Sequence, residues 1–191
     1  MDVEDILTLC NVEYLDSTET VSEGEDFVTF GIEAINDLVQ NDMPLESLPE
    51  AEDEISATKD TWVALENDFL SVIEVRDSDK GVYTDEYQLR ETVVEGTFTQ
   101  QIKFTETATF TVHYRQLPAR LTDLDDIPGI HPVYHPALAI GVAAKYFLYD
   151  DEEDPRGPSY MQMFQAKILE LSLRIDKQRV NHGHEYPSLE W

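Results

Sequence analysis

Hydrophobic residues spaced three and four apart predict two helices in the first forty residues. Residues 3–15 form one amphipathic helix whose apolar side carries Val3, Ile6, Leu7, Cys10 and Tyr14. After a polar stretch, Ser22 and Glu25 have the spacing of a capping box. The helix that they introduce has on one face Phe27, Phe30, Ala34, Ile35 and Leu38. Asn41 and Pro44 end this second helix, and the Pro- and Glu-rich residues 44–56 are interpreted as a loop.

Between Thr58 and about Arg115 the hydrophobic period changes from 3.6 to 2, which indicates β-structure. Short strands are predicted around residues 62–64 and 69–75, followed by a turn at 77–81. Segments rich in Thr, Val, Tyr and Phe continue the pattern over residues 82–94, 98–104 and 107–114. The turns between them are too short for crossover helices, so the strands are expected to run antiparallel.

Two more helices are predicted after a long connection over residues 118–132. Pro136 suits the first turn of a helix over residues 137–149, and the residues of that helix are apolar on nearly every side, which predicts burial. An acidic run and the Pro155–Pro158 loop separate it from the last helix. Ser159 is the predicted cap of that helix, which extends to about Val180 and carries on one face Phe164, Ile168, Leu171 and Ile175.

These elements predict an α+β fold, in which helix pairs from both ends of the chain pack as a bundle and an antiparallel sheet is inserted between them. The expected division is a helical domain of residues 1–57 and 116–180, a β-rich subdomain of residues 58–115, and an extended tail of residues 181–191.

The charge of the chain is large and unevenly distributed. Forty acidic residues against thirteen basic ones give a net charge of -27, which disfavours DNA binding by charge attraction. Residues 1–58 contain seventeen Asp and Glu and no Lys or Arg, whereas residues 156–179 contain five basic and two acidic residues. Opposite poles of this kind favour oriented association with another copy or with a partner. A solvated acidic surface, or adaptation to a salt-rich host, explains the acidity equally well.

No motif in the sequence supports catalysis or a cofactor. There is no Gly-rich phosphate loop and no nucleophile elbow, and Cys10 has acidic neighbours, which disfavour a reactive thiolate. His131 and His135 have a metal-pair spacing, but the adjacent prolines argue against one regular helix through both. His182 and His184 lie in the tail. We therefore expect no catalytic residue, metal site or cofactor. In addition, no apolar run reaches the roughly 20 residues of a membrane span.

Two stretches of the chain resemble head-to-tail adaptor proteins of tailed bacteriophages. The first, DTWVALENDFLSVIEV (60–75), is similar to the segment that opens the family's sheet, with Glu66 at the position usually held by proline. The second, VHYRQLPARLTDLDDIPGIHPVYHPALAIGVAAKYFLYDDEEDP (112–155), resembles the family's exit strand, its Tyr–His before a helix, and its alanine-rich helix that ends in acidic residues. The resemblance covers residues 60–180.

The resemblance implies a structural protein of the virion neck, assembled in the host cytoplasm and without a membrane. Its expected partners are further copies in a ring of twelve, together with the portal protein and the next neck protein or the tail. Double-stranded DNA is expected to pass through the channel of the ring without specific binding.

Three sets of residues are hypothesised to serve this role. An anchor for the portal lies in the tail at Tyr186, Pro187, Leu189 and Trp191. Acidic residues that line the channel are Asp150, Asp151, Glu152, Glu153 and Asp154. Basic residues that contact the neighbouring subunit are Lys167, Arg174, Lys177 and Arg179. Two alternatives stay open: a tail-completion or minor head protein, and a small acidic regulatory or DNA-mimic protein that occupies a basic groove.

Overall fold

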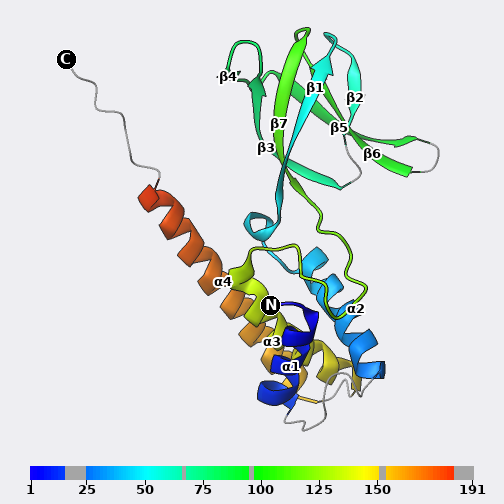
Figure 1. The fold of residues 1–191 in the computed structure, drawn as a ribbon, viewed down its shortest axis with the longest axis vertical. Coiled ribbons are helices and arrows are strands. Elements are labelled where there is room, and N and C mark those ends of the chain that lie inside the picture. The colour runs from blue at the N-terminus through cyan, green and yellow to red at the C-terminus, as the bar shows by residue number, and fades with distance from the viewer. Residues whose placement is uncertain (16–24, 66–67, 95–96, 151–153, 183–191) are drawn as a thin grey trace. The chain divides into compact units, whose positions relative to one another are not determined.

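The computed structural model describes residues 1–15, 25–65, 68–94, 97–150 and 154–182 (Figure 1). They form two compact units. One comprises residues 1–47 and 119–191 and is helical, and the other comprises residues 48–118 and consists of β-strands. The predicted α+β class is therefore confirmed: helices from both ends of the chain pack together, and antiparallel sheets are inserted between them.

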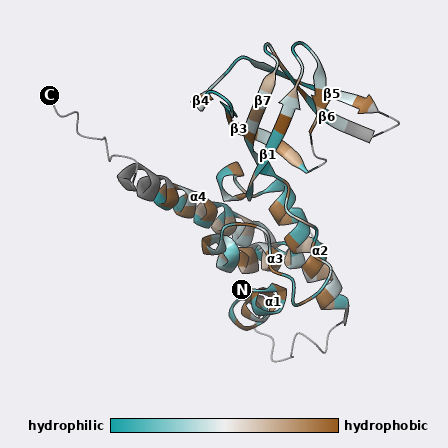
Figure 2. Cartoon of the chain, turned by 45° about the horizontal axis from the view of Figure 1, so that its top comes forward, coloured by the Kyte–Doolittle hydropathy of each residue, from teal (hydrophilic) through white to brown (hydrophobic). Residues whose placement is uncertain are grey.

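The helical unit is built around α3 (His135–Asp150), which packs against α1 (Val3–Cys10), α2 (Glu25–Asn41) and α4 (Arg156–His182). Because α3 has neighbours on several sides, its residues from Ala137 to Ala144 are all buried. A π-helical turn, η1 (Asn11–Leu15), extends α1. Two 3₁₀ turns lie beside longer elements: η3 (Leu45–Ser47) lies between α2 and β1, and η4 (Pro132–Tyr134) comes directly before α3. Along α2 and α4 the ribbon changes repeatedly between hydrophobic and hydrophilic residues (Figure 2).

A glycine at the centre of α3 lets two helices approach it closely. A Cβ atom at Gly141 would lie 2.7 Å from Leu38 Cδ1 of α2 and 3.2 Å from Phe164 Cδ2 of α4. The first distance is shorter than a carbon–carbon contact allows, so a side chain at this position would displace Leu38. The sequence places the glycine where α3 is in contact with both neighbours.

The start of α4 differs from the sequence-based expectation. Ser159 was predicted to cap this helix, but α4 begins three residues earlier, at Arg156. The Asp154 carboxylate accepts a hydrogen bond from the Arg156 backbone N–H at 2.8 Å, so Asp154 takes the capping role. Gly157 and Pro158 lie in the first turn, where a missing N–H leaves no helical hydrogen bond unmade. The predicted capping box at Ser22 lies outside the described residues.

The β unit contains two antiparallel sheets rather than the single sheet expected. One has the strand order β1 (Glu50–Ala57), β7 (Ala108–Gln116), β3 (Phe69–Asp77) and β4 (Val82–Tyr83). The other has the order β2 (Trp62–Ala64), β6 (Thr97–Phe104) and β5 (Tyr87–Val94). Buried residues of both sheets share one core, which includes Ile55, Val75, Ile102, Phe104, Phe110 and Val112.

Two sequence interpretations within this unit are wrong. Residues 44–56 are not a loop, because β1 occupies Glu50–Ala57 and pairs with β7 along its whole length. The segment 82–94 is not one strand, because the polar residues at 84–86 separate β4 from β5, which belong to different sheets. The strands predicted at 62–64, 69–75, 98–104 and 107–114 coincide with β2, β3, β6 and β7.

Candidate interaction surfaces

The outward side of α4 carries an apolar stripe in addition to the side that faces the core. Phe164, Ile168 and Leu171 are buried, as the sequence predicts. On the other side, Met163 is 46% exposed, Leu169 62% and Leu173 51%. These three residues, with Ala166, follow helical spacing along one face, and no described residue covers them. Isolated exposed leucines are common, whereas an aligned set makes this face a candidate interaction surface.

Basic side chains lie beside this stripe. Lys167 forms an ion pair with Glu170 at 2.9 Å, and Arg174 is exposed seven residues, or two turns, further along the helix. Both were hypothesised to contact a neighbouring subunit, and the structure places them on the same side of α4. Arg174 has no ion pair with any described carboxylate. Lys177 and Arg179 belong to the same helix, but their side chains lie outside the described residues.

Of the acidic run after α3, the structure describes only the two ends, Asp150 and Asp154, and their surroundings differ. Asp150 is exposed at the end of α3, residues 151–153 lie outside the described part, and Asp154 is held by the next helix. The Arg156 guanidinium contacts the Asp154 carboxylate at 2.6 Å, and this side-chain hydrogen bond is the main reason that the pKa of Asp154 lies below its ordinary value. Asp154 therefore has a structural partner, whereas Asp150 faces solvent.

The anchor hypothesised at Tyr186, Pro187, Leu189 and Trp191 lies outside the described residues. The structure neither places these side chains nor relates them to the rest of the helical unit.

One basic and aromatic cluster escaped the sequence analysis. On the three-stranded sheet, the guanidinium carbon of Arg90 lies 4.2 Å from the centre of the Trp62 ring, and Lys103 Nζ lies 4.9 Å from it. Arg90 also donates two hydrogen bonds to Gln101 Oε1. The strand register brings these residues to one face, and that register cannot be read from hydrophobic alternation alone.

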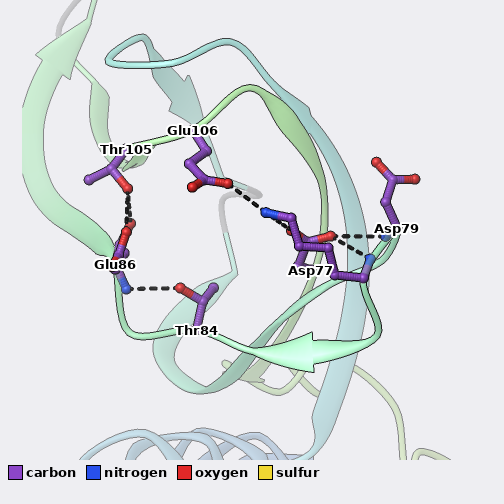
Figure 3. Close-up of polar contacts among 7 residues, drawn as sticks. Asp77, Asp79, Thr84, Glu86, Thr105 and Glu106 are labelled. Atoms are coloured by element: carbon purple, nitrogen blue, oxygen red, sulfur yellow. Dashed lines mark hydrogen bonds and ion pairs between the residues drawn. The ribbon is translucent and has the colours of Figure 1, made fainter.

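The turn between β3 and β4 is held together by acidic residues (Figure 3). The buried Asp77 carboxylate accepts hydrogen bonds from the backbone N–H groups of Asp79 and Lys80, and the bond from Lys80 is the main reason that the pKa of Asp77 is lowered. Lys80 Nζ bridges Asp77 at 3.1 Å and Glu106 at 2.6 Å. Because Lys80 links both carboxylates, the cluster stabilises the turn.

The histidines and the cysteine have structural surroundings. His131 Nδ1 accepts a hydrogen bond from the Val133 N–H, while the buried His135 contacts the Ile130 carbonyl through Nε2. Among the described residues, no three His, Cys, Asp or Glu side chains gather as a metal site requires. Burial raises the pKa of the Cys10 thiol to about 12, which disfavours the reactive thiolate.

Comparison with known protein families gives a match over most of the chain. None of the curated proteins matches the chain. Separately, no described helix is both long and apolar enough to cross a membrane. A family model described as SU10 adaptor protein matches residues 1–185, and the chain therefore belongs to the SU10 adaptor protein family.

Proposed function

We propose that this protein is a ring-forming adaptor in the neck of a tailed phage, where it binds beneath the portal and extends the DNA channel. The observation that carries the proposal is the family match over residues 1–185, because SU10 adaptors are phage neck adaptors and not a family known for enzymes. In this proposal about twelve copies form the ring, which receives the next neck protein or the tail.

Two features of the described residues support this role. The uncovered stripe on α4, with Met163, Leu169 and Leu173, supplies a surface that a subunit of an assembly would bury. The net charge of -27 gives the protein a surface that repels phosphate, so DNA can pass without being held. The acidic residues 150–153 are the proposed channel lining, whereas Asp154 caps α4.

The C-terminal tail is the proposed anchor on the portal. Tyr186, Leu189 and Trp191 supply the kind of aromatic and aliphatic side chains that dominate binding energy at protein interfaces. In this proposal the segment binds the portal, and the helical unit stays unchanged.

The experiment uses heads that carry portal but lack this protein. Purified protein is added, the heads are sedimented, and electron microscopy examines the portal vertex. We expect the full chain to cosediment and to form a ring, and a variant that lacks residues 183–191 to lose attachment at least about tenfold, since several aromatic contacts vanish together.

A protein that fails to cosediment at any concentration would contradict the adaptor role. A truncated variant that attaches as well as the full chain would contradict the anchor alone. The mutant Arg76→Gln, which changes an exposed residue of β3 in the other unit, serves as the control and should attach normally.

A further inference from the structure

A second surface in the helical unit has the properties that the α4 stripe needs in a partner. The outward side of α1 and η1 forms an open hollow of about 420 Å³ lined by Met1, Asp5, Thr8, Leu9 and Val12. Val12 is 61% exposed and Met1 is 40% exposed. Val3, Ile6, Leu7 and Cys10 face the core, while the outer side combines the apolar Met1, Leu9 and Val12 with Asp5 and Thr8. No described residue covers the outer side.

The charges of the two surfaces are opposite. Glu4, Asp5 and Glu13 are exposed around the α1 hollow and have no ion pair with any described residue. The first basic residue of the chain is Lys59, so no lysine or arginine lies near them in sequence. The α4 stripe is flanked by Lys167, which is paired with Glu170, and by Arg174, which has no ion pair with a described carboxylate. Docking of one surface on the other buries apolar side chains and places basic groups beside unpaired carboxylates.

The two surfaces cannot satisfy each other within one chain. Both α1 and α4 pack on α3 with their core sides, and the stripe and the hollow are on the outer sides of their helices. Within the described residues, neither surface can therefore serve as the partner of the other, and a second chain can supply the partner of each.

We propose that the α4 stripe of one copy docks into the α1 hollow of a second copy. The contact is heterologous, because it joins two different surfaces, and each added copy leaves one stripe and one hollow free. Repetition of this contact produces a head-to-tail series that closes as a ring when the rotation per copy divides a full turn. The inference names the subunit contact of the ring proposed above, and in that sense it rests on that proposal.

Mixing two blocked variants tests the contact. Leu169→Asp blocks the stripe and Val12→Asp blocks the hollow. Both positions are more than half exposed, so neither change disturbs a core. In sedimentation velocity, we expect wild-type protein to associate as its concentration rises. Each variant alone should associate about tenfold or more weakly, because a charge replaces a buried apolar contact.

An equimolar mixture of the two variants should form a dimer and nothing larger. The Val12→Asp copy keeps its stripe, the Leu169→Asp copy keeps its hollow, and their one productive contact leaves only blocked surfaces. Val82→Asp is the matched control: Val82 is a 52% exposed valine in the β unit, and its variant should associate like wild type. Circular dichroism confirms that each variant has kept its helices.

Three outcomes would overturn the inference: wild type that stays monomeric at every concentration, single variants that associate like wild type, or a mixture without dimers. A wild type that stays monomeric is also the result expected if the chain's own residues 16–24 or 183–191 cover the stripe. The experiment contains no portal, so dimers in the mixture together with no binding to heads would reject the neck role and leave the contact standing.

Discussion

His135 shows how burial of one residue links stability to pH. Its ring lies in the first turn of α3, where Nε2 contacts the Ile130 carbonyl at 3.2 Å and Nδ1 has no hydrogen-bond partner among the described residues. Burial favours the neutral ring and lowers the pKa of His135 below its ordinary value of 6.5. The unfolded chain therefore takes up a proton at a higher pH than the folded chain does.

We predict that the protein loses stability as the pH falls below about 6.5, because protonation of His135 is easier in the unfolded state. The contribution of neutral His135 to the free energy of unfolding is complete above pH 6.5, and it is lost as the pH falls through the pKa that His135 has in the folded protein. The slope for one proton cannot exceed about 1.4 kcal/mol per pH unit. Urea unfolding at pH 7.5, 6.5 and 5.5 measures how the free energy of unfolding depends on pH.

His135→Gln, which keeps a donor for Ile130, should flatten this dependence, whereas the exposed His131→Gln should retain it. An equal slope in wild type and His135→Gln would show that other groups cause the dependence.

At the scale of elements, the packing of α3 between α2 and α4 depends on Gly141. We predict that Gly141→Val destabilises the helical unit by about 1–3 kcal/mol, because the new side chain must push Leu38 and Phe164 out of a close-packed core. Urea unfolding monitored by circular dichroism measures the loss. Ala166→Val, on the exposed side of α4, introduces a similar side chain into open space and should change stability by less than about 0.5 kcal/mol. A Gly141→Val variant as stable as wild type would mean that α2 and α4 can move apart freely.

The helices could be predicted from sequence because each has an unmistakable apolar face, and the buried residues Ile6, Leu38 and Phe164 all belong to those faces. The first strand was missed for a physical reason. Its exposed positions, Glu50, Glu52 and Glu54, have low β-propensity, and their charges hid the alternation of Ala51, Ile55 and Ala57. Cross-strand partners compensate: Arg115 contacts Glu50 at 2.8 Å and His113 contacts Glu52 at 2.9 Å.

The exposed face of α4 was only partly recognised from the sequence. Charge alone pointed to Lys167 and Arg174, but the apolar half of the same surface was overlooked, although Met163, Ala166, Leu169 and Leu173 have regular helical spacing. A helix with a second apolar stripe is the sequence signal that would have found it. The cluster of Trp62, Arg90 and Lys103 left no such signal, because three separate strands contribute one residue each and only their register brings them together.

At the scale of the whole molecule, the acidic residues divide into those that hold the fold and those that are free for function. Asp77 and Asp154 have partners in the turn before β4 and at the start of α4, and neutralisation of either costs local structure. Asp150 has no such engagement with a described residue. This distinction decides how the channel hypothesis must be tested.

We predict that the combined change Asp150→Asn, Asp151→Asn, Glu152→Gln and Glu153→Gln leaves the stability of the protein nearly unchanged and alters DNA retention in assembled particles, because less negative charge faces the phosphates. Nuclease-protected DNA after mild heating, and the rate of DNA release, measure the effect. Asp154→Ala alone is the control, with a cost of about 1 kcal/mol in stability from the lost cap. Retention and release identical to wild type would remove these residues from the channel wall.

The β unit is entered and left at almost the same point. The Gln116 N–H donates to the Pro49 carbonyl at 3.1 Å, and Arg115 donates to the Leu48 carbonyl at 3.0 Å, so the two ends of the insertion are joined to each other. Because the two ends of the insertion are paired, changes in the length or sequence of its strands leave its two connections to the helical unit in the same place. Insertions and deletions within the β strands should therefore be tolerated without unfolding the helical unit.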